Sequence, residues 1–170
     1  VILSIDATKP ESSGSTTTEY LGKSTNTVSV AYSATDTNGV SSVTAYYSTL
    51  ANLSSPTSCG SATGLSGTSA TGTITCTLPS NPSVTSTFYM YTVATDTSGL
   101  IEDAPSIADD SFTHDAITPL STSTTSRSAS NSTTVSIGYS ATDAVGLSSV
   151  SVYYTSNSNV QSGTLCGAAN

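Results

Sequence analysis

Short runs of alternating apolar and polar residues recur along the chain, with turn residues between them. In the clearest run, Val28, Val30, Tyr32 and Ala34 alternate with serine, alanine and threonine. A period of two places every second side chain on the same face of a β-strand. This run therefore predicts a strand with one buried face.

Other segments with the same period, or next to them, complete a set of strands. Their ends coincide with proline, Asn-Gly or Asp-x-x-Gly, which are residues that favour turns. No window of 11 or more residues has the 3.6-residue period of an amphipathic helix. The pattern therefore predicts an all-β fold with strands at residues 14–22, 27–35, 40–48, 55–60, 71–78, 87–95 and 109–117.

A long internal repeat organises these strands. Residues 28–47 and 135–154 are identical at 13 of 20 positions, with an offset of 107 residues. Cys59-Gly and Cys166-Gly keep the same offset. A period of this length suits one β-sandwich domain, whereas a solenoid repeat is much shorter.

The repeat predicts three parts of the chain. Residues 1–8 are the last strand of a preceding repeat or a donor strand, residues 9–117 are a complete repeat, and residues 118–170 are the first half of the next one. About seven strands per repeat indicate tandem immunoglobulin-like β-sandwich domains, with a closed barrel as the alternative. The apolar strand Val1–Ile5 is expected to complete a domain of the same chain or of a neighbouring subunit.

Composition narrows the classes of partner. Only 8% of the residues are charged and the net charge is −8, while serine and threonine make up 68 of 170 residues. Nucleic acids and anionic membranes require clustered basic residues, so neither is an expected partner. The apolar runs are also too short to span a bilayer.

The three cysteines predict one disulfide. Cys59 and Cys76 lie 17 residues apart, and Cys166 is the repeat counterpart of Cys59. The counterpart of Cys76 would be residue 183, so the expected partner of Cys166 lies beyond this sequence. A Cys59–Cys76 disulfide would stabilise a thin core and would place the protein in an oxidising, extracytoplasmic setting. The alternative is a pair of buried thiols.

The acidic residues cluster at turns. Asp36, Asp96 and Asp143 each follow Ala-Thr and precede x-x-Gly. An aspartate in such a turn accepts hydrogen bonds from its own backbone, which explains the motif without a ligand. In the predicted sandwich, however, the strands before Asp36 and Asp96 run in the same direction, and the chain enters at the end where both finish. Carboxylates gathered there would suit calcium.

The calcium hypothesis assigns a set of carboxylates to two sites. The first site comprises Asp6, Asp36, Asp96, Glu102 and Asp103, and its next copy begins with Asp115 and Asp143. Without calcium, the pairs Glu102-Asp103 and Asp109-Asp110 are expected to form a solvated acidic face. No EF-hand pattern is present.

No catalytic motif is found. His114 has no serine or cysteine nucleophile at a recognised spacing, and no G-x-S-x-G or phosphate-binding loop occurs. The chain is therefore expected not to be an enzyme. Asn52 and Asn131 match the glycosylation sequon, which short serine-rich sequences also match by chance.

The Ala-Thr-Asp-x-x-Gly turn, the Tyr-x-Tyr-x-Val-Ala-Thr-Asp strand at 89–96 and the Asp-x-x-x-Pro junction resemble bacterial immunoglobulin-like repeats. The resemblance implies a non-catalytic repeat unit of a cell-surface or extracellular filament or stalk, with neighbouring repeats or identical subunits as partners, and possible assembly by strand complementation. An adhesin module that binds a carbohydrate or a receptor, and phage or virion surface decoration, are the alternatives. No organic cofactor is implied, and calcium is the one ion considered.

Overall fold

The computed structural model describes residues 5–80, 82–125, 134–156 and 163–170. Every regular element among them is a β-strand, which confirms the all-β prediction. None of the described segments forms a helix with the length and apolarity needed to cross a lipid bilayer. The chain divides into two compact units, Val1–Ala116 and Ile117–Asn170, so the predicted boundary after residue 117 lies one residue further along.

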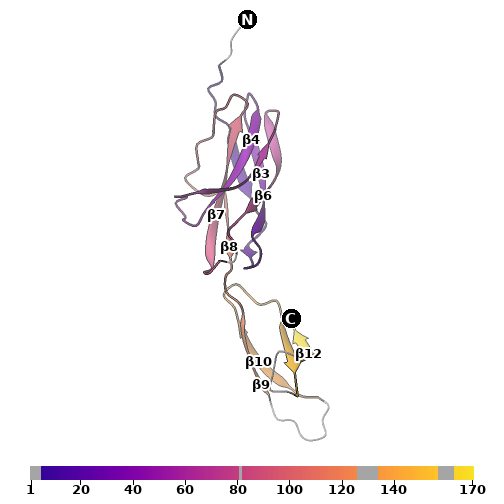
Figure 1. Ribbon diagram of the computed structural model, residues 1–170. Coiled ribbons are helices and arrows are strands. Elements are labelled where there is room, and N and C mark those ends of the chain that lie inside the picture. The colour runs from indigo at the N-terminus through magenta and orange to yellow at the C-terminus, as the bar shows by residue number, and fades with distance from the viewer. Residues whose placement is uncertain (1–4, 81, 126–133, 157–162) are drawn as a thin grey trace. The chain divides into compact units, whose positions relative to one another are not determined.

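The first unit contains two separate sheets, compatible with a β-sandwich and not with one closed sheet (Figure 1). A three-stranded sheet has the order β1-β3-β6, and a five-stranded sheet has the order β2-β8-β7-β4-β5. Neighbouring strands are antiparallel, except that β2 runs parallel to β8. The strands are β1 (Glu11–Ser15), β2 (Tyr20–Leu21), β3 (Thr27–Thr35), β4 (Val40–Ser48), β5 (Thr57–Thr63), β6 (Ser69–Thr77), β7 (Ser86–Asp96) and β8 (Asp110–His114).

Two segments differ from the predicted strands. The segment predicted at 14–22 is split between β1 and β2, which belong to different sheets. A turn separates them, in which the Thr18 amide donates to Thr16 Oγ1 at 3.1 Å. The segment predicted at 55–60 is β5, which extends to Thr63 and pairs with β4 at the edge of the five-stranded sheet. The alternation in 27–35 and the strand at 40–48 have the predicted bounds.

The core lies between the two sheets. On β3 the predicted apolar residues Val28, Val30, Tyr32 and Ala34 are all buried, and the residues between them are exposed. They pack against apolar side chains from the opposite sheet, which form two clusters with them. The opposing side chains are Leu21, Val40, Val43, Ala45, Phe88, Met90, Ala94 and Phe112.

Acidic side chains join β1 to β7 where the two sheets meet. Glu102 accepts hydrogen bonds from the amides of Ser12 and Ala94, both at 2.8 Å. Asp109 Oδ2 likewise accepts from the amides of Gly14 and Thr92, at 2.8 and 2.9 Å. Each carboxylate therefore pairs two backbone donors that no neighbouring strand reaches.

A third carboxylate extends the same arrangement by one step. Asp110 Oδ2 accepts a hydrogen bond from the Thr16 amide at 2.7 Å. The bonded amides of the first segment belong to every second residue, as expected for one edge of an extended strand. The expectation of a fully solvated acidic face is therefore wrong for Glu102, Asp109 and Asp110, because backbone donors at the sheet edges need acceptors.

The second unit repeats part of this architecture. Its strands are β9 (Leu120–Thr125), β10 (Ile137–Thr142), β11 (Val150–Tyr154) and β12 (Thr164–Ala169). β9 pairs with β10 and β11 pairs with β12, both antiparallel. Residues 1–4 lie outside the described residues and residues 5–10 form no strand, so the role predicted for residues 1–8 stays a prediction.

The carboxylate bridges predict a specific loss of stability. The substitution Asp109→Ala should lower the free energy of unfolding by about 2–4 kcal/mol, because two backbone donors lose their acceptor at about 1–3 kcal/mol each. Urea unfolding of the purified chain measures this. The control Asp103→Ala, which removes an exposed ion pair, should change the value by less than about 1 kcal/mol. Equal effects of the two substitutions would contradict the assignment.

Candidate functional site

Asp36 ends the strand that carries the clearest alternation. It follows β3, and its Oδ1 accepts hydrogen bonds from the amides of Asn38 at 2.7 Å and Gly39 at 3.0 Å. Gly39 has a φ of 115°, a conformation that glycine adopts without strain. The predicted turn capping is therefore present, and it uses one of the two carboxylate oxygens.

Asp96 has the same role at the end of β7. Its Oδ1 accepts hydrogen bonds from the amides of Ser98 and Leu100, both at 2.8 Å. Its side chain is 1% exposed. Burial favours the neutral carboxyl group, but hydrogen bonds from the Ser98 hydroxyl and from the amides of Leu100, Ser98 and Gly99 outweigh it and hold the pKa of Asp96 below its ordinary value of 3.8.

Asp6 lies on the segment that leads into β1. Its Oδ1 accepts a hydrogen bond from the Thr8 amide at 3.0 Å. β1 begins where β3 ends, since Glu11 lies opposite Thr35. The incoming segment therefore passes the turn that follows β3.

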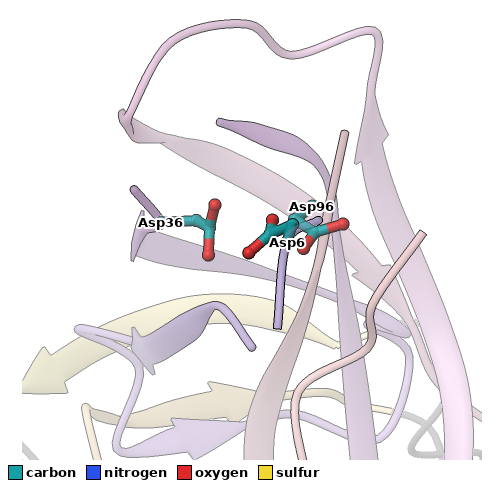
Figure 2. Close-up of side chains that lie close together, drawn as sticks. All are labelled: Asp6, Asp36 and Asp96. Carbon is teal, nitrogen blue, oxygen red and sulfur yellow. The ribbon is translucent and has the colours of Figure 1, made fainter. Parts of the chain in front are cut away.

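The three aspartates converge, as the topological prediction required (Figure 2). One oxygen from each of Asp6, Asp36 and Asp96 lies within 4.8 Å of the others. The turns after β3 and β7 are bonded directly, because the Thr97 amide donates to Gly39 O at 2.8 Å. The group offers only carboxylate oxygens, which are donors suited to hard cations such as calcium and magnesium.

The other predicted ligands lie elsewhere or in different contacts. Glu102 bridges β1 and β7, and Asp103 pairs with Lys9. Asp115 Oδ1 accepts a hydrogen bond from Thr85 Oγ1 at 2.9 Å. Asp143 lies in the second unit, in a turn described below.

The two predicted glycosylation sites remain predictions. Asn52 is exposed, and its Oδ1 accepts hydrogen bonds from the Ser54 amide at 3.2 Å and the Ser54 hydroxyl at 2.8 Å. Asn131 falls outside the described residues.

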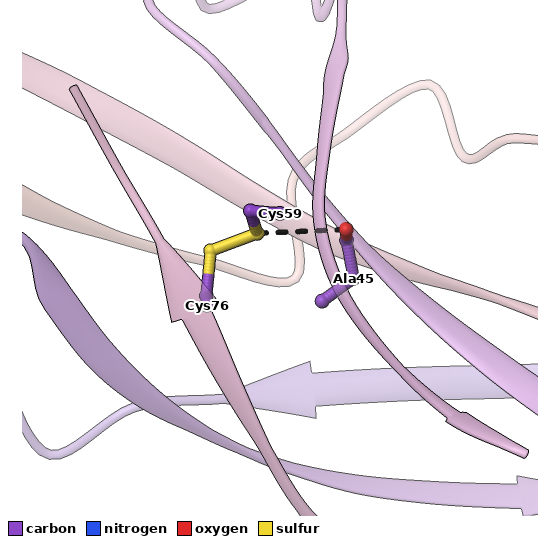
Figure 3. The surroundings of a disulfide bond; sticks show 3 residues. All are labelled: Ala45, Cys59 and Cys76. Atoms are coloured by element: carbon purple, nitrogen blue, oxygen red, sulfur yellow. Dashed lines mark hydrogen bonds between the residues drawn. A yellow bond between two sulfur atoms is a disulfide. The ribbon is translucent and has the colours of Figure 1, made fainter.

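The disulfide is present as predicted and connects the two sheets (Figure 3). Cys59 lies on β5 of the five-stranded sheet and Cys76 on β6 of the three-stranded sheet, with 4.6 Å between their Cα atoms. Close approach of these strands requires Gly60, where a Cβ atom would lie 2.5 Å from Thr75 O. Cys166 is a free, exposed thiol.

His114 offers no catalytic arrangement. It is fully buried, and its ring lies 5.8 Å from that of Phe88. Neither ring nitrogen has a hydrogen-bond partner among the described residues. No carboxylate therefore orients this imidazole toward a nucleophile.

Sequence reasoning missed the bridging role of Glu102 and Asp109. The one available signal was the scarcity of charge, since 11 acidic residues occur in a chain with only three basic ones. Acids that have no basic partners need other donors, and unpaired backbone amides are the most abundant ones. The signal does not say which amides they bind.

The disulfide predicts a measurable loss of stability on reduction. Because the cross-link closes a loop with a sequence separation of 17, reduction should lower the free energy of unfolding by about 3 kcal/mol. Urea unfolding with and without dithiothreitol measures this. The double variant Cys59→Ser/Cys76→Ser should not respond to the reductant. A wild-type chain whose stability is unchanged by reduction would contradict the assignment.

The lowered pKa of Asp96 predicts acid sensitivity. Folding favours the ionised form, so the contribution of Asp96 to stability is full above the unfolded pKa of about 3.9 and is lost as the pH falls through the folded value. The wild type should therefore exceed Asp96→Asn in stability at pH 7, by a margin that shrinks below about pH 4. Denaturant unfolding in EDTA across this range measures the margin, and a margin independent of pH would refute the prediction.

Comparison with known proteins adds no assignment. No protein-family model matches the chain, and no curated protein matches it. The function is therefore inferred from the repeat, the two sheets and the arrangement of the acidic residues.

Proposed function

We propose that this chain is part of a tandem array of immunoglobulin-like sandwiches that forms a non-catalytic stalk or filament outside the cell. Neighbouring repeats or identical subunits would be its partners. The observation that carries the proposal is that the two units share strand registers, residue for residue.

The hairpins of the two units correspond closely. In the first unit Tyr47 of β4 lies opposite Thr57 of β5, and in the second Tyr154 of β11 lies opposite Thr164 of β12. Both residues of the second pair are 107 positions later. Both hairpins also have a bulge immediately before the first tyrosine of their Tyr-Tyr pair. Identical pairing supports two copies of one domain design.

The other strand pair supports the same interpretation. Glu11 of β1 lies opposite Thr35 of β3, and Leu120 of β9 lies opposite Thr142 of β10. The offsets are 109 and 107 residues, so the copies differ only by two residues before the second strand of the pair.

An apolar groove in the second unit also has a counterpart. Subtracting 107 from four of its lining residues gives residues that form the buried core of the first unit. The groove residues are Val135, Ile137, Val150 and Val152, and their counterparts are Val28, Val30, Val43 and Ala45. This equivalence supports the second unit as the first half of the same sandwich.

Strand order supports the immunoglobulin-like assignment. In that fold the first, second and fifth strands share one sheet, while the third, sixth and seventh share the other. Counting β1 as the first strand and omitting the two-residue β2, the observed sheets have this arrangement, and β5 extends the second sheet as an additional strand does in variable-type domains. The inter-sheet disulfide supports an oxidising location.

Immunoelectron microscopy of the producing cells tests the proposal. Antibodies raised against the purified chain should label intact cells along surface or released filaments, at repeated positions. Serum pre-absorbed with the same chain is the control. Label on virus particles, label confined to filament tips, or label that needs permeabilised cells would each contradict a structural stalk, and the first two would favour virion decoration and an adhesin.

A further inference from the structure

Two of the three converging aspartates have an oxygen with no hydrogen-bond partner. Oδ2 of Asp6 and Oδ2 of Asp36 are buried and accept no hydrogen bond among the described residues. Asp36 is only 7% exposed. Its carboxylate is directed toward Asp6 and Asp96, as Figure 2 shows. Buried carboxylate oxygens without a partner cost several kcal/mol or more, so the arrangement calls for a positive ligand.

No basic side chain of the described residues supplies that charge. Lys9 is close to Asp6 in sequence but pairs with Asp103. The hydrogen bonds that Asp6, Asp36 and Asp96 do accept come from neutral amides and a hydroxyl of their own turns. Three mutually close carboxylates therefore remain uncompensated by the protein itself.

We propose that Asp6, Asp36 and Asp96 bind one calcium ion. The donors are all oxygen, and histidine and cysteine are absent from the group. Two oxygens bound on opposite sides of Ca²⁺ lie about 4.6–5.2 Å apart, and about 4.0–4.2 Å apart around Mg²⁺, from the usual metal–oxygen distances. Ligand atoms separated by up to 4.8 Å therefore fit the larger ion without contraction.

Access and additional ligands are available at this position. An open depression next to the group is lined by Thr8, Thr35, Asp36 and Thr68, so solvent reaches the site from the surface. Calcium takes six to eight oxygen ligands, and water completes the coordination when carboxylates are few.

The second unit contains an independent copy of the partly used aspartate. Oδ1 of Asp143 accepts hydrogen bonds from the amides of Val145 at 2.9 Å and Gly146 at 3.0 Å. Its Oδ2 is buried and has no hydrogen-bond partner among the described residues. Asp143 is the repeat counterpart of Asp36, so the same division between a capping oxygen and an unused oxygen occurs twice.

Calcium would connect three separate parts of the first unit. Asp6 belongs to the segment before β1, whereas Asp36 and Asp96 follow β3 and β7. Binding would hold the incoming segment against the ends of both sheets. This inference does not depend on the proposed stalk, since the site lies within one unit.

Calcium titration of the whole chain tests the proposal. After treatment with EDTA and exchange into metal-free buffer, isothermal titration should show calcium binding that Asp6→Asn weakens at least tenfold. Asparagine keeps an oxygen for the Thr8 amide, so the turn is preserved. The control Asp103→Asn removes one negative charge outside the group and should bind as the wild type does.

Thermal unfolding provides a second readout with opposite signs. Calcium at about 100 times its Kd should raise the melting temperature of the wild type by about 10 °C. Asp6→Asn should be at least as stable as the wild type in EDTA, because repulsion is relieved, and less stable than the wild type in calcium. A variant that is less stable in both conditions would indicate a structural role only and would overturn the proposal.

Two other results would also overturn it. Absence of calcium binding by the wild type at millimolar concentration excludes the site, and equal binding by Asp6→Asn excludes this set of ligands. An equal stabilisation by magnesium at the same concentration would reject calcium as the specific ligand.

Discussion

Two sheets with a thin apolar core must be held together where their ladders stop, and here carboxylates do this. Glu102 and Asp109 each accept one amide from the β1 segment and one from β7, which belong to different sheets. An ionised carboxylate bonds two amides at once and forms stronger hydrogen bonds than a neutral acceptor. The position of β1, and with it the path of the chain into the first unit, depends on these bonds.

The acidic residues of this chain therefore do not form one class. Asp36, Asp96 and Asp143 each cap a turn that ends a strand or follows one. Glu102 and Asp109 replace a missing ladder, and Asp103 lies at the surface with Lys9. A net charge of −8 is compatible with folding because many of the negative charges accept backbone amides.

The two units show how local sequence reproduces local geometry. The Ala-Thr-Asp-x-x-Gly motif forms the same turn twice, with glycine at a φ of 115° in the first copy and 144° in the second. The hairpin that follows each turn has its bulge at the same position of the motif. Short-range hydrogen bonds decide these features, so they persist although the second unit lacks, among its described residues, strands equivalent to β6, β7 and β8.

The sequence by itself determined the strands with strict alternation, the turns, the repeat and the cysteine pair, because period-two burial and turn chemistry are local. It also indicated that Asp6, Asp36 and Asp96 would meet, since strand directions follow from the order of the sandwich. Only the tertiary structure decided that 14–22 divides between two sheets, that β5 joins β4, and that Glu102 and Asp109 bridge β1 and β7. These outcomes depend on which backbone donors remain unpaired once the sheets are assembled, and no local pattern records that.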